Sequence, residues 1–209
     1  MPRPLFLSLD GLDGAGKSTQ CRLLAEWLRS LGRTVVECAD PGGTAVGDEL
    51  RHILLDGQHH LALPCEMLLF MASRAQLVAE VIRPALEAGR TVLCDRYLLA
   101  NVVYQGHGGG LDPDNLWEIG RVATGDVLPD LTVVLDLPPA KAAARRSRVA
   151  DRFESRTEDY QRRVRDGFRA EARRFPDRIR VIDADQPADA VHLLIRAEVS
   201  RVLATREGT

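Results

Sequence analysis

The chain has 209 residues, of which 45% are hydrophobic and 28% are charged, and its formal net charge is −2. This composition is that of a folded globular protein, so it excludes wholesale disorder and collagen-like repeats. The near-neutral charge argues against a general nucleic-acid coat, and no apolar run approaches the ~18–20 residues that a membrane-spanning helix needs. We therefore expect no nucleic-acid partner and no membrane partner.

In the first half of the chain, short apolar runs alternate with longer amphipathic runs. In chain order, the predicted elements are a strand at 4–10, a helix at 17–31, a strand at 33–39, and helices at 44–55 and 63–88. The run 63–88 is the longest, and Pro84 near its end is expected to kink the helix or restart it.

The same alternation continues through the second half of the chain. In chain order, we predict a strand at 90–94, a helix at 112–124, a strand at 130–137, helices at 139–148 and 157–174, a strand at 178–183, and a helix at 188–204. Apolar strands separated by helices indicate a parallel sheet that is covered on both faces. We predict one three-layer α/β/α domain over 1–209 with five parallel strands, whose ligands bind beyond the carboxyl ends of the strands.

The four cysteines have no spacing that is typical of a disulfide framework or a zinc site. Cys21, Cys38, Cys65 and Cys94 lie far apart, and none has a second cysteine or a pair of histidines beside it. We expect small buried side chains in a reducing, cytoplasmic compartment.

The segment 11–19 reads GLDGAGKST and matches the pattern GxxxxGK[ST] in full. It follows a predicted strand and begins a predicted helix, which is the setting of a phosphate-binding P-loop. Glycines let successive main-chain amides point at a phosphate, and the helix N-terminus adds positive potential there. A chance glycine turn is the competing interpretation. The predicted nucleotide-binding residues are Gly11, Leu12, Asp13, Gly14, Ala15, Gly16, Lys17, Ser18 and Thr19.

Two of these side chains have a specific expected task. Lys17 would bring a cation to the β- and γ-phosphates of a nucleotide, and Ser18 would offer its hydroxyl to Mg²⁺. A P-loop alone does not define the reaction, so motor, switch and kinase remain open at this point. No NKxD or DxxG motif lies at a suitable place, which argues against a Ras-like GTPase.

An arginine-rich segment at 145–156 reads RRSRVADRFESR. Planar guanidinium groups bind phosphate oxygens through two bonds at once, so the segment is a candidate mobile lid over the phosphates. The alternative is a solvated helix face with ion pairs between successive turns. Beside a P-loop in so short a chain, the lid is the favoured interpretation.

Taken together, these motifs make the chain resemble thymidylate kinases of the bacterial type with a basic lid, over nearly its whole length. The resemblance rests on GLDGAGKST, DPGGT at 40–44 with LR at 50–51, LFMASRAQ at 69–76, DRY at 95–97, a YQG turn at 104–106, PDLT at 129–132, and the segment 145–156. It implies a P-loop kinase fold and transfer of the γ-phosphoryl group of ATP to dTMP with Mg²⁺. It also implies a homodimer.

The resemblance implies roles for residues outside the loop. Asp95 would act near Mg²⁺ together with Ser18, and Arg96 would bind the dTMP phosphate. The arginines of the lid would close on the phosphates. The catalytic residues implied in this way are Lys17, Asp95, Arg96, Arg145 and Arg148.

The acceptor base would be read from a helix and from the segment after the DRY motif. Phe70 would stack on thymine and Arg74 would donate to a base carbonyl, since residues four apart share one helix face. Packing in the core is the competing interpretation of Phe70. Asn101 or Gln105 would hydrogen-bond to the ring edge. Tyr104 would reject a 2′-hydroxyl, and the remaining implied substrate-binding residues are Asp10, Asp40 and Arg51.

The chain departs from the family pattern on the acceptor side. Ala39 and Asp40 stand where Arg-Glu is usual, Ala100 stands where Ser is common, and Gly109 stands where an Arg is often found. Gly14 stands where some members carry an arginine in the loop. Two alternatives are therefore kept, a P-loop kinase for another nucleotide or nucleoside and a catalytically weak ATP-binding protein.

Overall fold

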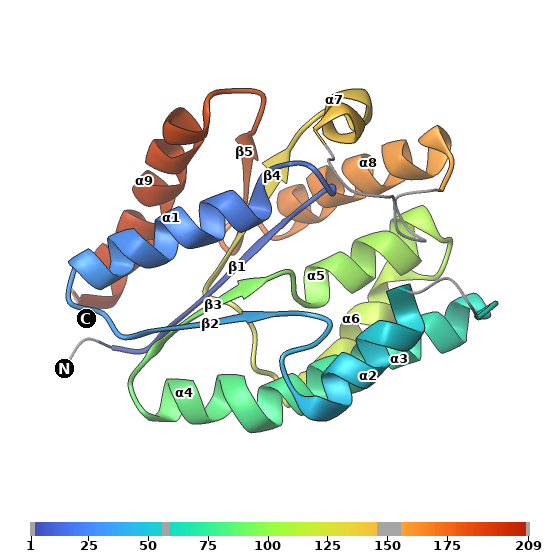
Figure 1. Ribbon diagram of the computed structural model, residues 1–209, viewed down its shortest axis with the longest axis horizontal. Coiled ribbons are helices and arrows are strands. Elements are labelled where there is room, and N and C mark those ends of the chain that lie inside the picture. The colour runs from blue at the N-terminus through green and yellow to red at the C-terminus, as the bar shows by residue number, and fades with distance from the viewer. Residues whose placement is uncertain (1–2, 56–58, 146–155, 208–209) are drawn as a thin grey trace.

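Five parallel strands form a single sheet in the computed structural model, which describes residues 3–55, 59–145 and 156–207 (Figure 1). The strands are β1 (Leu5–Gly11), β2 (Val35–Ala39), β3 (Thr91–Asp95), β4 (Leu131–Asp136) and β5 (Ile179–Asp183). Their order across the sheet is β2-β3-β1-β4-β5, and every neighbouring pair is parallel. The predicted five-stranded parallel sheet is confirmed.

Helices cover both faces of this sheet, which gives the three predicted layers (Figure 1). One face carries α1 (Lys17–Ser30) and α9 (Ala188–Glu207). The opposite face carries α3 (Leu63–Leu77), α4 (Arg83–Glu87), α5 (Leu98–Asn101), α6 (Pro113–Thr124) and α8 (Glu158–Arg174). Two further helices lie outside these, with α2 (Ala45–Leu55) against α3 and α7 (Pro139–Ala144) against α8.

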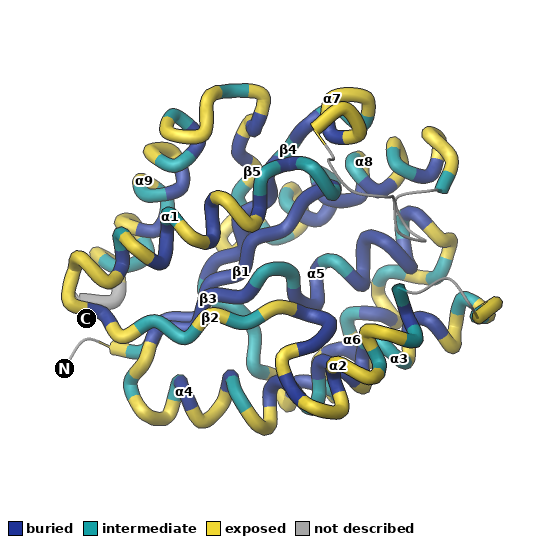
Figure 2. The backbone as a smooth tube through the Cα atoms, viewed as in Figure 1, coloured by how far each residue is buried: buried dark blue, intermediate teal, exposed yellow. Residues whose placement is uncertain are grey.

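The central strand β1 is buried along its whole length (Figure 2). Successive side chains of a strand point to opposite faces, and Leu7 belongs to the core cluster that includes Leu28 of α1, whereas Phe6 belongs to the cluster that includes Ile82. A strand with helices on both sides has no solvent face. This explains why its sequence is an unbroken apolar run.

The long predicted helix at 63–88 is interrupted by a wide π-helical turn, η1 (Val78–Ile82), between α3 and α4. The N–H of Arg83 donates to the carbonyl of Val78, five residues back. Pro84 follows directly and has no N–H to continue the ordinary ladder. The interruption expected near Pro84 therefore takes the form of a wide turn.

The interpretation of residues 104–106 as a turn is wrong. They lie inside η2 (Val102–Gly108), a π-helical segment that continues α5. Valines and glycines are weak helix formers, so this sequence carries no helical signal of its own. Residues 102–106 are all buried, and packing against α6 and α8 stabilises the helical conformation.

Candidate functional site

A cleft of about 740 Å³ lies at the carboxyl ends of the central strands. Of the predicted site residues, it is lined by Asp13, Gly14, Ala15, Gly16, Lys17, Ser18, Thr19, Asp40, Arg51, Phe70, Arg74, Asp95, Arg96, Asn101, Tyr104, Gln105 and Arg145. Three others, Asp10, Gly11 and Leu12, are buried beneath it and are not in its lining. Arg148 and the rest of the predicted lid from 146 to 155 lie outside the described residues.

The loop between β1 and α1 needs glycine at two positions for different reasons. Gly11 has φ +132, and a Cβ there would lie 2.5 Å from the main-chain oxygen of Leu135 on β4. Gly16 has φ +99 and would meet no atom within 4 Å, so its backbone faces open space directly before α1. The first glycine lets two strands approach each other, and the second leaves room for a ligand at the helix N-terminus.

Two cations converge on one carboxylate at the centre of the cleft. Lys17 Nζ lies 3.3 Å and Arg96 Nη2 lies 2.7 Å from Asp13 Oδ1. Burial raises the pKa of the Asp13 carboxyl, but Arg96 and Lys17 outweigh burial and hold that pKa well below its usual range. Asp13 is therefore ionised, and it holds both cations. They lie between the P-loop and the part of the cleft that is lined by Phe70 and Arg74.

Arg96 has two features that are typical of a ligand-binding arginine. Its φ of +69 is in the left-handed region, which side chains other than glycine rarely adopt. Its Nη1 is buried and has no hydrogen-bond partner, while the guanidinium lies 4.9 Å from the centre of the Tyr104 ring. A strained backbone and an unpaired buried donor fit an anion that binds here.

Asp10 lies deeper than these groups. Its side chain is fully buried, and neither carboxylate oxygen has a partner. Burial raises the pKa of Asp10 to about 7, although the charges of Arg96 and Lys17 act in the opposite direction. Asp10 is not in the lining of the cleft, and its role in substrate binding stays a prediction.

The predicted metal ligands meet at the end of the loop. Ser18 lies in the first turn of α1, and its Oγ is 3.4 Å from Oδ2 of Asp95 at the end of β3. Among the described residues, no group of three or more His, Cys, Asp and Glu side chains could hold a metal ion. One hydroxyl and one carboxylate fit Mg²⁺, which commonly takes few protein ligands and completes its shell with water and phosphate oxygens.

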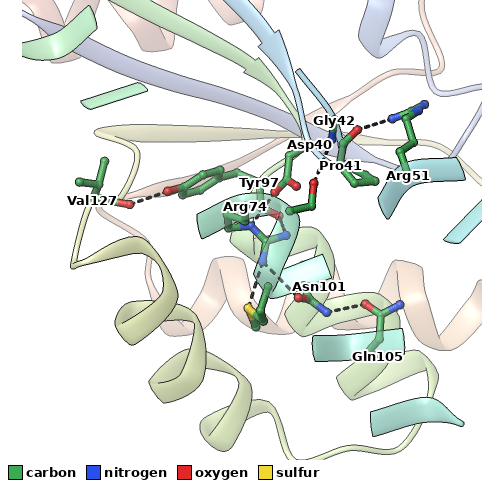
Figure 3. A network of polar contacts seen from close by, with 11 residues as sticks. Asp40, Pro41, Gly42, Arg51, Arg74, Tyr97, Asn101, Gln105 and Val127 are labelled. Atoms are coloured by element: carbon green, nitrogen blue, oxygen red, sulfur yellow. Dashed lines mark hydrogen bonds and ion pairs between the residues drawn. The ribbon is translucent and has the colours of Figure 1, made fainter. Parts of the chain in front are cut away.

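The second part of the cleft has a floor of polar side chains in a row (Figure 3). Arg74 is 1% exposed, and its Nε donates to Asp40 Oδ2 at 2.5 Å. Its Nη1 donates to Asn101 Oδ1 at 3.1 Å, and Asn101 Nδ2 donates to Gln105 Oε1 at 2.8 Å. Phe70, one helical turn before Arg74, is half-buried and lines the same space. A flat apolar ring beside a polar edge suits a nucleobase.

Sequence reasoning missed the far end of the cleft. The lining there comes from α1, from the segment between β5 and α9, and from the start of α9: Gln20, Ala184, Gln186, Ala188 and Val191. Arg145 Nη1 donates to the main-chain oxygen of Ala184 at 3.1 Å, so the first residue of the predicted lid lies at this end. This part of the lining could have been predicted from the sequence, because the loop after the fifth predicted strand lies at the same edge of the sheet as the P-loop.

A P-loop at the end of the central strand of a parallel sheet, next to a pocket lined by Arg96 with its unpaired donor, defines a P-loop phosphotransferase of the nucleotide-kinase class. The thymidylate kinase family model matches residues 9–195. On this basis the chain belongs to the thymidylate kinase family.

Individual relatives agree with this assignment. A thymidylate kinase of Desulfovibrio desulfuricans is 44% identical over 97% of this chain and 98% of its own length. One of Exiguobacterium is 45% identical over 90% of each chain. The crystal structure of thymidylate kinase from Ehrlichia chaffeensis superimposes with a TM-score of 0.78 at 30% identity, covering 95% of this chain and 99% of the other. Within the described residues, no helix has the length and apolar character needed to cross a membrane.

Proposed function

We propose that the protein transfers the γ-phosphoryl group of ATP to dTMP, giving dTDP and ADP. The observation that carries the proposal is the convergence of Lys17 and Arg96 on Asp13, between the P-loop and the pocket with Phe70 and Arg74. Phosphoryl transfer between two polyanions needs cations at the point where they meet, and it needs the two substrates held in line. One cation faces each substrate in this arrangement.

The donor nucleotide occupies the loop and the far end of the cleft in this proposal. The loop amides and Lys17 hold the phosphates of ATP, and the segment around Gln186 takes its base. Ser18 and Asp95 hold Mg²⁺, which would neutralise charge on the β- and γ-phosphate oxygens. Arg145 lines the cleft at the same end, where it would face the donor phosphates.

The acceptor occupies the pocket on the other side of Asp13. The unpaired Nη1 of Arg96 binds the phosphate of dTMP, Phe70 stacks on the thymine ring, and Arg74 with Asn101 faces the base edge. Tyr104 lies under the guanidinium of Arg96, where it would narrow the space for the sugar. One sheet carries both subsites, which supports the proposal of one phosphotransferase domain.

A homodimer and a cytoplasmic location belong to the same proposal. The four cysteines are free, as expected in a reducing compartment. Three neighbouring helices, α2, α3 and α6, expose large apolar side chains, which a second copy of the chain would cover.

The test is a coupled assay of ADP release with ATP and Mg²⁺ over a panel of dTMP, dUMP, dCMP, UMP and thymidine. We expect the highest kcat/KM with dTMP. A higher kcat/KM with another acceptor would establish a different nucleotide or nucleoside kinase. Binding of ATP with no turnover of any acceptor would establish a non-catalytic protein.

A further inference from the structure

The row of polar side chains in Figure 3 continues beyond the cleft to a buried carboxylate, that of Glu66 on α3. Glu66 is 1% exposed and is not part of the cleft lining. Gln105 Nε2 donates to its Oε1 at 2.9 Å. Arg156 Nη2 donates to both of its oxygens, at 3.2 and 2.9 Å. The buried carboxylate thus has a charged partner in Arg156 on one side and the amide of Gln105 on the other.

The hydrogen bonds of this row all run in one direction. Arg74 donates to the oxygen of Asn101, the nitrogen of Asn101 donates to the oxygen of Gln105, and the nitrogen of Gln105 donates to Glu66. A guanidinium can only donate and a carboxylate can only accept. Because the row has a donor at one end and an acceptor at the other, neither amide can turn over without placing two donors or two acceptors against each other.

We infer that Glu66 is a positioning residue that sets the specificity for the acceptor base by locking the orientation of the Gln105 and Asn101 amides. The inference rests on the proposed function, in which Asn101 faces the base edge and Gln105 lines the same pocket. Thymine and cytosine differ at the ring edge, where thymine presents an acceptor oxygen and cytosine a donor amine. A locked amide matches one of these patterns, whereas an amide that is free to turn over accommodates both.

The arginine on the other side of Glu66 is itself held by the fold. Arg156 lies 4.6 Å from the centre of the Tyr160 ring, and the Tyr160 hydroxyl donates to the main-chain oxygen of Tyr104 at 2.8 Å. The segment that begins α8 is thus attached to the same helical turn that carries Gln105. This arrangement fixes the position of the Glu66 carboxylate relative to the amide that it orients.

The direct test is Glu66→Gln, which keeps the size of the side chain but replaces the obligatory acceptor with an amide that can donate. We expect the ratio of kcat/KM for dTMP to kcat/KM for dCMP to fall by about 10-fold or more, mainly through a higher KM for dTMP. The KM for ATP should change by less than about twofold. Glu26→Gln is the matched control, because Glu26 forms an exposed pair with Arg22 on α1, and it should leave the ratio unchanged.

A double-mutant cycle with Gln105→Leu separates orientation from general damage. If Glu66 acts through the amide of Gln105, adding Glu66→Gln to Gln105→Leu changes the ratio no further. Should Glu66→Gln fail to fold, the double variant Glu66→Met with Arg156→Leu removes both charges together, and it is expected to lower the ratio in the same way.

The outcomes separate the inference from the proposed function. A wild-type protein that phosphorylates dTMP, with an unchanged ratio in a folded Glu66 variant, overturns the inference and leaves the proposed function standing. A wild-type protein that does not use dTMP overturns the proposed function, and the inference falls with it. An equal loss of activity with dTMP and dCMP assigns Glu66 to the fold alone and also overturns the inference.

Discussion

Lys17 is only 7% exposed, and its Nζ donates to the main-chain oxygens of Gly11 and Leu12 at 3.3 and 3.1 Å. A lysine held in this way has already lost much of its side-chain entropy and its water before substrate binds. Its charge is therefore preorganised toward the phosphates, and this is the condition under which electrostatic stabilisation of a transition state is strongest.

Lys17→Met tests this role. We expect kcat for phosphoryl transfer to fall by about 100-fold or more, because a contact that strengthens in the transition state is lost. The only other lysine of the chain, Lys141, supplies the control, since it pairs with Asp185 and is not in the cleft lining. Lys141→Met should keep kcat within about twofold. A Lys17→Met protein with a near wild-type kcat would contradict the assignment.

Base stacking and core packing are the two competing interpretations of the Phe70 side chain. It is half-buried, it lines the cleft, and it also packs against the core. Phe70→Ala should weaken dTMP binding by about 1–3 kcal/mol, measured by titration calorimetry, and should leave ATP binding unchanged. Phe70→Ala should also lower the free energy of unfolding by less than Phe168→Ala does. For Phe168→Ala we expect a loss of ~3–5 kcal/mol, because Phe168 is 2% exposed. Unchanged dTMP affinity with a core-sized loss of stability would favour packing.

At this scale, the predictable residues were those that belong to a local motif. Lys17 and Ser18 stand in one contiguous pattern whose geometry is set by the strand and helix beside it. Glu66 and Gln186 carry no such pattern. Tertiary packing alone brings each of them to its place. Glu66 contacts Gln105, which is 39 positions away in the sequence, and Gln186 lines the far end of the cleft beside the P-loop.

The element that begins after the predicted lid, α8, is attached to the sheet by a cluster of charges. Arg165 donates to both oxygens of Asp136 at the end of β4, at 2.7 and 2.9 Å, and Arg169 donates to Oδ2 at 2.6 Å. Burial raises the pKa of Asp136, but the hydrogen bonds from the two arginines outweigh burial and lower it below the ordinary value. The cluster therefore stabilises the fold only while Asp136 is ionised.

Asp136→Asn should lower the free energy of unfolding by about 2 kcal/mol at neutral pH, because it removes a charged acceptor of three hydrogen bonds. The pKa of Asp is ~3.9 in the unfolded chain and lower in the native state, so the stabilisation is complete above about pH 5 and is lost as pH falls below about 4. Urea unfolding at neutral pH and near pH 3 should show the difference between wild type and variant shrinking in acid. An equal difference at both values would contradict the role of ionisation.

The control is Asp159→Asn, which removes the partner of Arg162 in an exposed pair at the first turn of the same helix. An exposed pair contributes little, so its free energy of unfolding should change by less than about 0.5 kcal/mol at either pH.

The elements themselves were predictable to different degrees. The central strands β1, β3 and β4 were found because a buried parallel strand is an apolar run that few other structures produce, whereas the edge strands β2 and β5 are partly exposed. The helical segment from α5 into η2 was not found, because Val103 and Gly106 favour other local conformations and only their burial stabilises a helix. The wide turn before Pro84 was expected as a break, but its hydrogen-bond register depends on packing that a sequence does not display.

At the scale of the whole molecule, three helices on one side of the sheet leave apolar side chains in solvent. Val46 on α2 is 52% exposed, Leu68 on α3 is 53% exposed, and Val122 on α6 is 85% exposed. Both α2 and α6 contact α3, so these side chains belong to adjacent helices. A second copy of the chain that covered them would bury apolar surface and shield α3, the helix that carries Phe70 and Arg74.

Sedimentation equilibrium should therefore give about twice the chain mass of 23.1 kDa. Leu68→Glu combined with Val122→Glu should yield a monomer, since it places two charges in the contact that apolar surface would otherwise form. The matched control is Leu193→Glu on α9, which is 61% exposed on the opposite face of the sheet and should remain a dimer. A wild-type monomer, or dissociation caused by Leu193→Glu alone, would assign the association to another surface or to none, and the apolar side chains of α2, α3 and α6 would then be ordinary exposed residues.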